Sequence, residues 1–253
     1  MKSNTWVALI LAAAVLAASS LACCGSVIDL PSFLPSRTVR GSGNLTEETR
    51  AARDFDRVAL SGIGTLTIEQ GEEEGLRIEA EDNLMPYVET EVVGRQLTIG
   101  IQPRANLRPT KPIRYSLSVR DLERIEVSGS GDVRAADLQA SDLTIVISGA
   151  GDADLPGLSA DRLTVRLSGA GDLTVTGQVD DQVVHIDGAG TYTARDLASQ
   201  VAEVDVSGSG SATVRVSERL ETTVSGSGSV RYIGDPVVEE SVSGAGSVRQ
   251  IGE

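Results

Sequence analysis

The stretch S-G-S-G-D at residues 128–132 predicts the fold of this chain, because it returns at a nearly constant interval. The form S-G-A-G-D follows twice, and looser copies follow four more times. These copies start at residues 148, 168, 187, 207, 225 and 243, so the spacing is 18 to 20 residues. A fixed period of this length is typical of repeat architectures in which each unit packs only against its neighbours.

The side chains keep one phase of alternation through the signature. In residues 163–175, every second residue is apolar or glycine, and the residues between are mostly polar. A period of two indicates a strand with one buried and one wet face. The glycines should therefore face inward, where they leave room for the opposite wall or let the chain turn with a positive φ. The expected turn glycines are Gly129, Gly131, Gly149, Gly151, Gly169, Gly171, Gly188, Gly190, Gly208, Gly210, Gly226, Gly228, Gly244 and Gly246.

This continuity of phase favours an all-β fold, a single-stranded parallel β-helix (β-solenoid) with about twenty residues per coil. The alternative is a β-meander with a hairpin at each glycine pair, which would need a second layer that the sequence does not supply. An early copy, Ser61-Gly62-Ile63-Gly64, lies 67 residues before Ser128, and three longer coils would fill that gap. The expected total is about ten coils, with the irregular N-terminal region capping one end.

The N-terminus has the pattern of an export signal. A charged start is followed by an apolar run at residues 6–18, which is too short to span a bilayer comfortably. The run Leu21-Ala22-Cys23-Cys24 resembles a bacterial lipoprotein cleavage box, in which a Leu stands three residues before the lipidated Cys. That spacing selects Cys24 over Cys23. The alternative is an ordinary secretory signal. No other cysteine is present, so the exported part has no internal disulfide.

The charge balance limits the partners of the chain. The formal net charge is −14, so a surface of this kind should repel nucleic acid and anionic lipid headgroups. Arg104, Arg108, Lys111 and Arg114 form a small basic island among prolines. We expect a solvated loop that balances nearby carboxylates, and the alternative is a contact site for an acidic partner.

Catalytic and metal sites find little support in the sequence. Asp132, Asp152 and Asp172 would stack as a carboxylate ladder and are weak candidates for Ca²⁺, but later copies replace them with Ser or Thr. The alternative role is a turn residue that bonds to nearby backbone. His185, the single histidine, alternates with Val184 and Ile186 and should point outward. We expect no metal, no cofactor and no catalytic residues.

Three further motifs add a family resemblance. Phe55-Asp56-Arg57-Val58, the early Ser61-Gly62-Ile63-Gly64 and the Asp82-Asn83-Leu84 turn, together with the repeat, resemble the bacterial DUF2807 family. That family is described as the putative auto-transporter adhesin head (GIN) domain. The resemblance covers roughly residues 45–250 and implies a parallel β-helix, a cell-envelope location and an adhesive role. No catalytic residues come with it.

The sequence therefore predicts three segments: a lipoprotein signal peptide at 1–24, a flexible tether at 25–44 and an adhesin-head-like β-solenoid at 45–253, with clear repeats at 125–250. The expected function is a non-enzymatic, exported, membrane-anchored surface module that binds or acts as a spacer. Its partners would be the membrane, through the lipid, and a glycan or envelope protein, with no nucleic acid. Association through the solenoid ends is an open alternative. The rival function is a polysaccharide-active enzyme on a β-helix scaffold.

Overall fold

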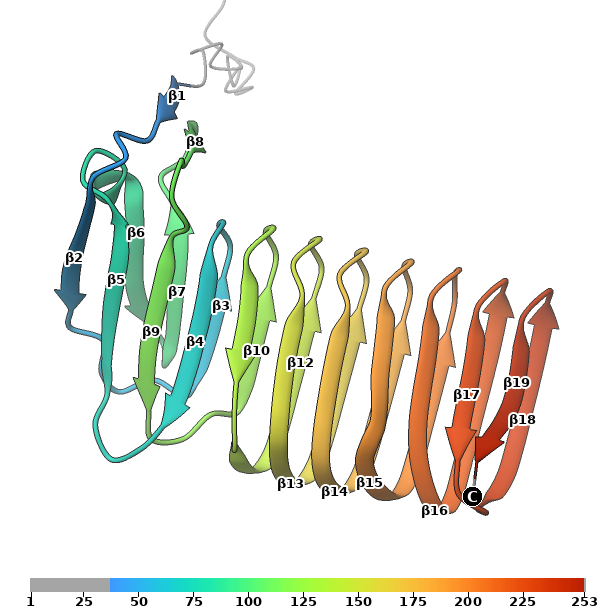
Figure 1. The fold of residues 1–253 in the computed structure, drawn as a ribbon. Helices are drawn as coiled ribbons and strands as arrows, with labels where there is room; N and C mark the ends of the chain where they lie inside the picture. Colours follow the sequence, from blue (N-terminus) through green and yellow to red (C-terminus); the bar gives the residue numbers. More distant parts are fainter. Residues whose placement is uncertain (1–36, 253) are drawn as a thin grey trace, which may run out of the picture. The chain divides into compact units, whose positions relative to one another are not determined.

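The computed structural model describes residues 37–252, and this part is built almost entirely from β-strands (Figure 1). One 3-10 turn, η1 (Met85–Tyr87), interrupts them. The short strands are β1 (Arg37–Arg40), β2 (Leu45–Arg50), β3 (Arg57–Leu60), β4 (Thr65–Gln70), β5 (Gly75–Glu81), β6 (Val88–Val93), β7 (Gln96–Ile101), β8 (Ala105–Arg108), β9 (Arg114–Val119), β10 (Arg124–Val127), β11 (Asp132–Ala135) and β12 (Gln139–Ile147). The remaining strands are β13 (Ala153–Leu167), β14 (Leu173–Ile186), β15 (Thr191–Val206), β16 (Ser211–Gly226), β17 (Ser229–Ile233), β18 (Val237–Gly244) and β19 (Ser247–Gly252).

The repeats form a parallel β-solenoid, as the alternation predicted. Each long strand from β13 to β16 starts just after one signature, bends, and reaches the next signature. We call the sheet face formed by residues that precede a signature the first face, and the face formed by residues that follow it the second face. The N-terminal half of each long strand lies on the second face, and its C-terminal half lies on the first face. The solenoid has about six turns of about twenty residues each, so the expected ten coils were too many. The meander alternative is wrong, because successive repeats pair in parallel.

The missing coils are explained by the path of the first strands. The early copy at residues 61–64 connects β3 to β4, and these strands pair directly with β10 and β11. The 67-residue gap is therefore an excursion and not three coils. In that excursion the chain builds β7 and β9, which pair with β3 and β4 on their other edge. Sequence spacing could not show that β3 and β4 lie between strands that form later in the chain.

Antiparallel strands cap the N-terminal end of the stack, as expected. Strand β6 pairs with β7, β5 pairs with β9, and β2 pairs with β5. The tether expected at 25–44 is too long, because β1 pairs in parallel with β8 at residues 37–40. Residues 25–36, like the signal segment with Cys23 and Cys24, lie outside the described residues. All described strands and the core follow residue 36, so residues 25–253 contain the whole folded unit.

The core consists of apolar columns that run along the stack. One such column is formed by residues that end the first-face strands and pair in register. Its members are Leu60, Val127, Ile147, Leu167, Ile186, Val206, Val224 and Val242. Every member is buried except Val242 in the last coil, which is 44% exposed. Stacked aliphatic residues explain how the chain builds a continuous core with few aromatic side chains.

The last coil carries polar residues at core positions. Glu240 pairs in register with buried Thr222, and Gln250 pairs with Tyr232. Both polar residues are exposed in the terminal coil. An inward-pointing charge on an edge strand discourages a further strand from pairing there. The edge formed by β18 and β19 therefore carries polar residues at core positions beside the exposed apolar side chains of Val237, Val242 and Ile251.

The signature glycines are required by close backbone stacking. A Cβ on Gly169 would overlap the carbonyl oxygen of Gly149 in the preceding coil, and a Cβ on Gly171 would overlap that of Gly151. The same clash recurs at the other copies along the stack. Among the signature glycines of the repeats, only Gly226 and Gly244 have a positive φ. The glycines therefore leave room for the backbone of the adjacent coil, where the sequence led us to expect room for the opposite wall.

Backbone hydrogen bonds continue through the signature turns. The amides of Ala150, Ala170 and Ala189 donate to the carbonyls of Gly129, Gly149 and Gly169 at 3.0, 3.1 and 3.1 Å. Similar bonds link the later copies. The turn is thus a rung of the sheet ladder and not a free loop. Its small outward residues leave the glycine column free to approach the next coil.

Substitution of one column glycine tests this packing. We expect Gly169→Ala to lower the free energy of unfolding by about 3 kcal/mol, because the added methyl overlaps backbone that cannot move without breaking the ladder. Gly71→Ala is the matched control, since a Cβ there has no neighbour within 4 Å, and it should change stability by less than about 1 kcal/mol. Chemical denaturation of residues 25–253 measures both. Equal stability of the two variants would contradict the stacking account.

Candidate binding groove

The aspartates of the signature belong to the backbone ladder. The amide of Asp152 donates to Asp132 Oδ1 at 3.1 Å, and that of Asp172 donates to Asp152 Oδ1 at 2.9 Å. The amide of Thr191 completes the series at Asp172 Oδ1, 2.8 Å. Each aspartate side chain thus accepts a backbone amide of the next coil, as a backbone carbonyl would elsewhere in the ladder. This geometry supports the turn-residue interpretation of these aspartates, and within residues 37–252 no three acidic, His or Cys side chains gather as a metal-ligand group.

His185 lies on the outward side of β14, between buried Val184 and Ile186, as expected. Its Nδ1 is 3.3 Å from Asp205 Oδ2 of the next coil. The pair lies on the first face, in the column in which Arg166, His185 and Asp205 pair in register. It contributes to contact between coils and lies outside the groove described next.

A long polar groove follows the bend opposite the signature turns. It consists of two adjoining hollows of about 820 and 710 Å³ that share Asp121, Gln139, Ala140 and Ser141. We call their combined surface the bend groove. The larger hollow begins at the N-terminal strands, and the smaller one continues along four further bends as far as Ser217. No aromatic side chain is among the residues that line either hollow.

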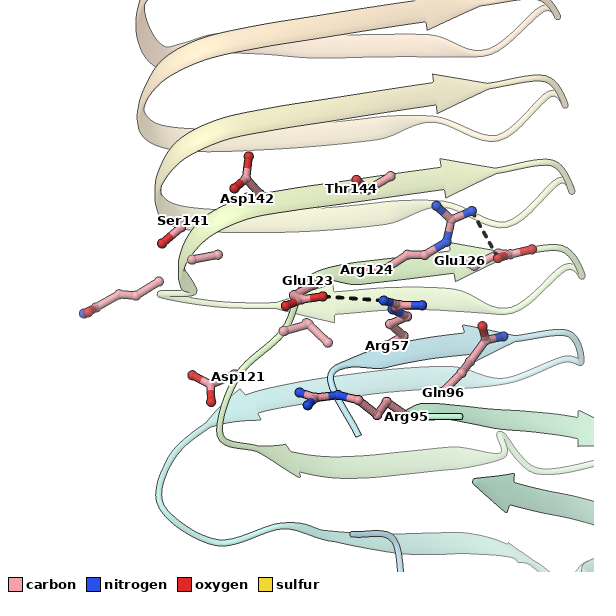
Figure 2. Close-up of a pocket in the computed structure, with 13 residues that line it drawn as sticks. Arg57, Arg95, Gln96, Asp121, Glu123, Arg124, Glu126, Ser141, Asp142 and Thr144 are labelled. Carbon is pink, nitrogen blue, oxygen red and sulfur yellow. Dashed lines mark hydrogen bonds and ion pairs between the residues drawn. The ribbon is translucent and has the colours of Figure 1, made fainter. Parts of the chain in front are cut away.

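The N-terminal part of the groove is lined by paired charges (Figure 2). Arg57 Nη2 lies 3.8 Å from Glu123 Oε2, and Arg124 Nη2 lies 3.5 Å from Glu126 Oε2. Arg95 forms an ion pair with Asp56. Because each arginine has a carboxylate beside it, this part presents both signs of charge in alternation rather than a single basic patch.

Asp56 holds two arginines of the charged part, Arg57 and Arg95, in place. Its side chain is buried, and its Oδ1 lies 3.6 Å from Arg57 Nε. The hydrogen bond and charge of Asp56 raise the pKa of Arg95, which keeps that guanidinium charged. The backbone carbonyl of Asp56 also accepts the amide of Glu123 at 2.8 Å. The Phe55-Asp56-Arg57-Val58 motif therefore fixes the end of the groove and also begins strand β3.

The remainder of the groove repeats small polar side chains from coil to coil. Gln139, Ser159 and Gln178 pair in register and form one column, which continues with Ala198 in the following coil. In the neighbouring column, Gln200 Nε2 donates to Asp180 Oδ1 at 2.9 Å. Coils are separated by roughly 4.8 Å, the usual strand spacing. The groove therefore offers amide, hydroxyl and carboxylate groups on several successive coils.

A buried polar network stiffens the bend beneath this part. Tyr192 Oη donates to Gln182 Oε1 at 3.1 Å, and Gln182 Nε2 donates to Ser199 Oγ at 2.7 Å. Ser199 Oγ in turn donates to the carbonyl of Arg215 at 2.8 Å. Burial raises the pKa of Tyr192 far above its ordinary value, so its hydroxyl stays a donor. These side chains replace apolar packing where the strands bend and the register shifts.

The groove was not predicted from the sequence. Its residues lie in the part of each repeat that has no fixed consensus, and they come from coils about twenty residues apart. The available signal was the recurrence of Gln, Ser and Asp at residues 139–141, 159–161 and 178–180. Such a surface can hydrogen-bond to an extended polymer. A general acid for glycoside cleavage needs a raised carboxyl pKa. Within residues 37–252 the carboxyl groups with a shifted pKa are Glu81 and Asp82, which lie outside the groove, and both pKa values are lowered.

The comparison with protein families identifies the fold family. The model of DUF2807, described as "Putative auto-transporter adhesin, head GIN domain", matches residues 54–236. The chain belongs to the DUF2807 family. That match includes the charged end of the bend groove and most of the stacked coils. No curated protein sequence matches the chain significantly.

Solved structures of similar proteins share the fold. A putative adhesin from Bacteroides fragilis NCTC 9343 is 25% identical, with a TM-score of 0.80 over 84% of this chain and 100% of its own. A putative lipid binding protein from Parabacteroides distasonis ATCC 8503 is 23% identical, with a TM-score of 0.72 over 85% and 100%. A putative adhesin from Parabacteroides merdae ATCC 43184 is 23% identical, with a TM-score of 0.67 over 85% and 99%. The latter two comparisons support the fold of this DUF2807 chain.

Within residues 37–252 the DUF2807 chain has no helix that is long and apolar enough to cross a membrane.

Proposed function

We propose that this DUF2807 protein is a non-enzymatic surface module that holds an extended, hydroxyl-rich polymer, a cell-envelope glycan, in the bend groove. The observation that carries the proposal is the regular column of hydrogen-bonding side chains along the bend. Family membership and the adhesin description of the Bacteroides fragilis neighbour support a binding role rather than catalysis.

The chemistry of the groove favours a glycan over a protein partner. Protein interfaces depend on buried aromatic and Arg anchors in apolar pockets, whereas the lining of this groove is mostly polar and lacks aromatic groups. Amide and hydroxyl groups alternate over Gln139, Ser159 and Gln178 at the coil spacing of roughly 4.8 Å, which is close to the length of one sugar ring in an extended chain. The affinity for a polymer would then be the sum of many weak hydrogen bonds along the groove, and it would not require one deep pocket.

Two groove substitutions test the proposed function. We expect Gln178→Ala with Asp180→Ala to weaken binding of a retained glycan by about tenfold, because two hydrogen-bonding groups are lost. The matched control is Asp154→Ala with Thr174→Ala, which removes an acid and a neutral polar group that pair on the second face. Binding is measured on glycan arrays and isolated envelope polysaccharide with residues 25–253. Absence of glycan binding, or equal losses in the groove and control variants, would overturn the proposal.

We also propose that the module is exported and held at the membrane by a lipid on Cys24. The support is the apolar run at residues 6–18 and the Leu21-Ala22-Cys23-Cys24 box. Mass spectrometry of the mature chain from a bacterial host should show an N-terminal, lipid-modified Cys24. An unmodified N-terminus, or lipid on Cys23, would disprove this assignment. The solenoid would then stand outside the membrane with its groove open to envelope polymers.

A further inference from the structure

The pairing of β1 with β8 gathers positive charge that is scattered in the sequence. Arg37 and Arg40 lie on β1, Arg108 ends β8, and Lys111 follows shortly after. We call these two strands, with Lys111, the basic ribbon. The ribbon projects beyond the ends of β7 and β9, on the side of the signature turns (Figure 1). The sequence suggested only half of this cluster, because β1 was expected to be part of the tether.

The four cations of the basic ribbon are exposed and unneutralised. Among the described residues, none of Arg37, Arg40, Arg108 and Lys111 has a carboxylate oxygen within 4.0 Å. Arg40 pairs in register directly opposite Arg108. Like charges in that position destabilise a strand pair, so an anion that bridges them would relieve the repulsion. Arg114 differs, since it forms an ion pair with Glu79.

The carboxylate at the base of the ribbon is committed to the backbone. Glu81 is buried and accepts the amides of Gly43 and Thr110 at 2.6 and 2.8 Å, as well as the Thr110 hydroxyl. Burial alone would raise the pKa of Glu81, but these hydrogen bonds outweigh it and lower the pKa below its ordinary value. Glu81 therefore holds together the segments that follow β1 and β8 in the chain.

The neighbouring turn fastens β1 in the same way. Asp82 accepts the Ser42 hydroxyl, and this hydrogen bond is the main cause of its lowered pKa. Asn83 Nδ2 donates to the carbonyl of Arg40 at 2.8 Å, and Asn83 Oδ1 accepts the amide of Ser42 at 2.9 Å. The Asp82-Asn83 turn thus holds the ribbon in place while the guanidinium groups stay free to meet an external anion.

We propose that the basic ribbon docks on the surface of a bilayer that contains anionic phospholipid. Guanidinium and ammonium groups bind lipid phosphates, and each contributes about fivefold to partitioning onto such a surface. The net charge of −14 predicts repulsion between the molecule as a whole and anionic headgroups. In this proposal the ribbon is a local exception, because it concentrates positive charge at one projecting tip of an otherwise acidic molecule.

Docking through the ribbon also orients the groove. The bend groove lies at the opposite end of the strands from the signature turns and the ribbon. A ribbon on the membrane therefore points the groove outward. β1 starts 13 residues after Cys24, which is at most about 45 Å of extended chain, so a lipid on Cys24 would leave the ribbon within reach of the bilayer. The charge of the ribbon is sufficient for docking, with or without a glycan in the groove or a lipid on Cys24.

Vesicle co-sedimentation of residues 25–253 tests the ribbon. Binding should occur to phosphatidylcholine vesicles that contain phosphatidylglycerol and not to pure phosphatidylcholine. Arg40→Gln with Arg108→Gln should lower the partition coefficient about 25-fold, and Arg40→Lys with Arg108→Lys should retain most of it. Raising the salt concentration to about 1 M should abolish binding, since the screening length falls to about 3 Å.

The matched control is Arg231→Gln with Arg249→Gln, two exposed arginines on β17 and β19 at the far end of the stack that change the net charge equally. This variant should bind anionic vesicles as well as the parent does, with an unchanged unfolding transition for all variants. Equal losses in both Gln pairs, or binding that ignores phosphatidylglycerol, would overturn the proposal. Binding to soluble dextran sulfate without binding to vesicles would also overturn it.

Discussion

The contact between the glycine columns of successive coils sets the geometry of this protein. At each signature the carbonyl oxygen of one glycine occupies the space where a Cβ of the next would lie. Only a chain without side chains at these points can turn sharply and still keep its amides bonded to the coil beneath. Because the turn is fixed in this way, the flanking strands stay in register and the aliphatic columns bury themselves without large aromatic residues.

The same constraint separates structure from function along each repeat. The signature side must keep small residues, and its aspartates are used as acceptors for the next coil. On the bend side Gly177 and Gly234 make a similar backbone contact, but the outward side chains there differ in type from coil to coil, and there the bend groove forms. The fold is therefore held at one end of the strands and offers its chemistry at the other. The basic ribbon extends this polarity, since it lies on the signature side, away from the groove.

Much of the fold followed from local pattern. The period of about twenty, the inward phase of Val165, Leu167 and Gly169, and the capping role of the first strands are all visible in the sequence, because each depends on side chains close in the chain. The number of coils was wrong because β3 and β4 pair with strands far ahead of them, and no local signal records that order. The groove and the ribbon could not be predicted from the sequence for the same reason. Gln139 meets Ser159, and Arg40 meets Arg108, only after the strands have paired.

Native-state hydrogen exchange at the signature amides tests the central claim most directly. The claim is that the signature is a hydrogen-bonded rung and not a glycine-rich loop. The amides of Ala150, Ala170 and Ala189, although they belong to exposed residues in turns, should then exchange as slowly as those of the buried strands and open only with them. Exchange of these amides at the rate of an unstructured glycine-rich peptide, while the strand amides stay protected, would contradict the account.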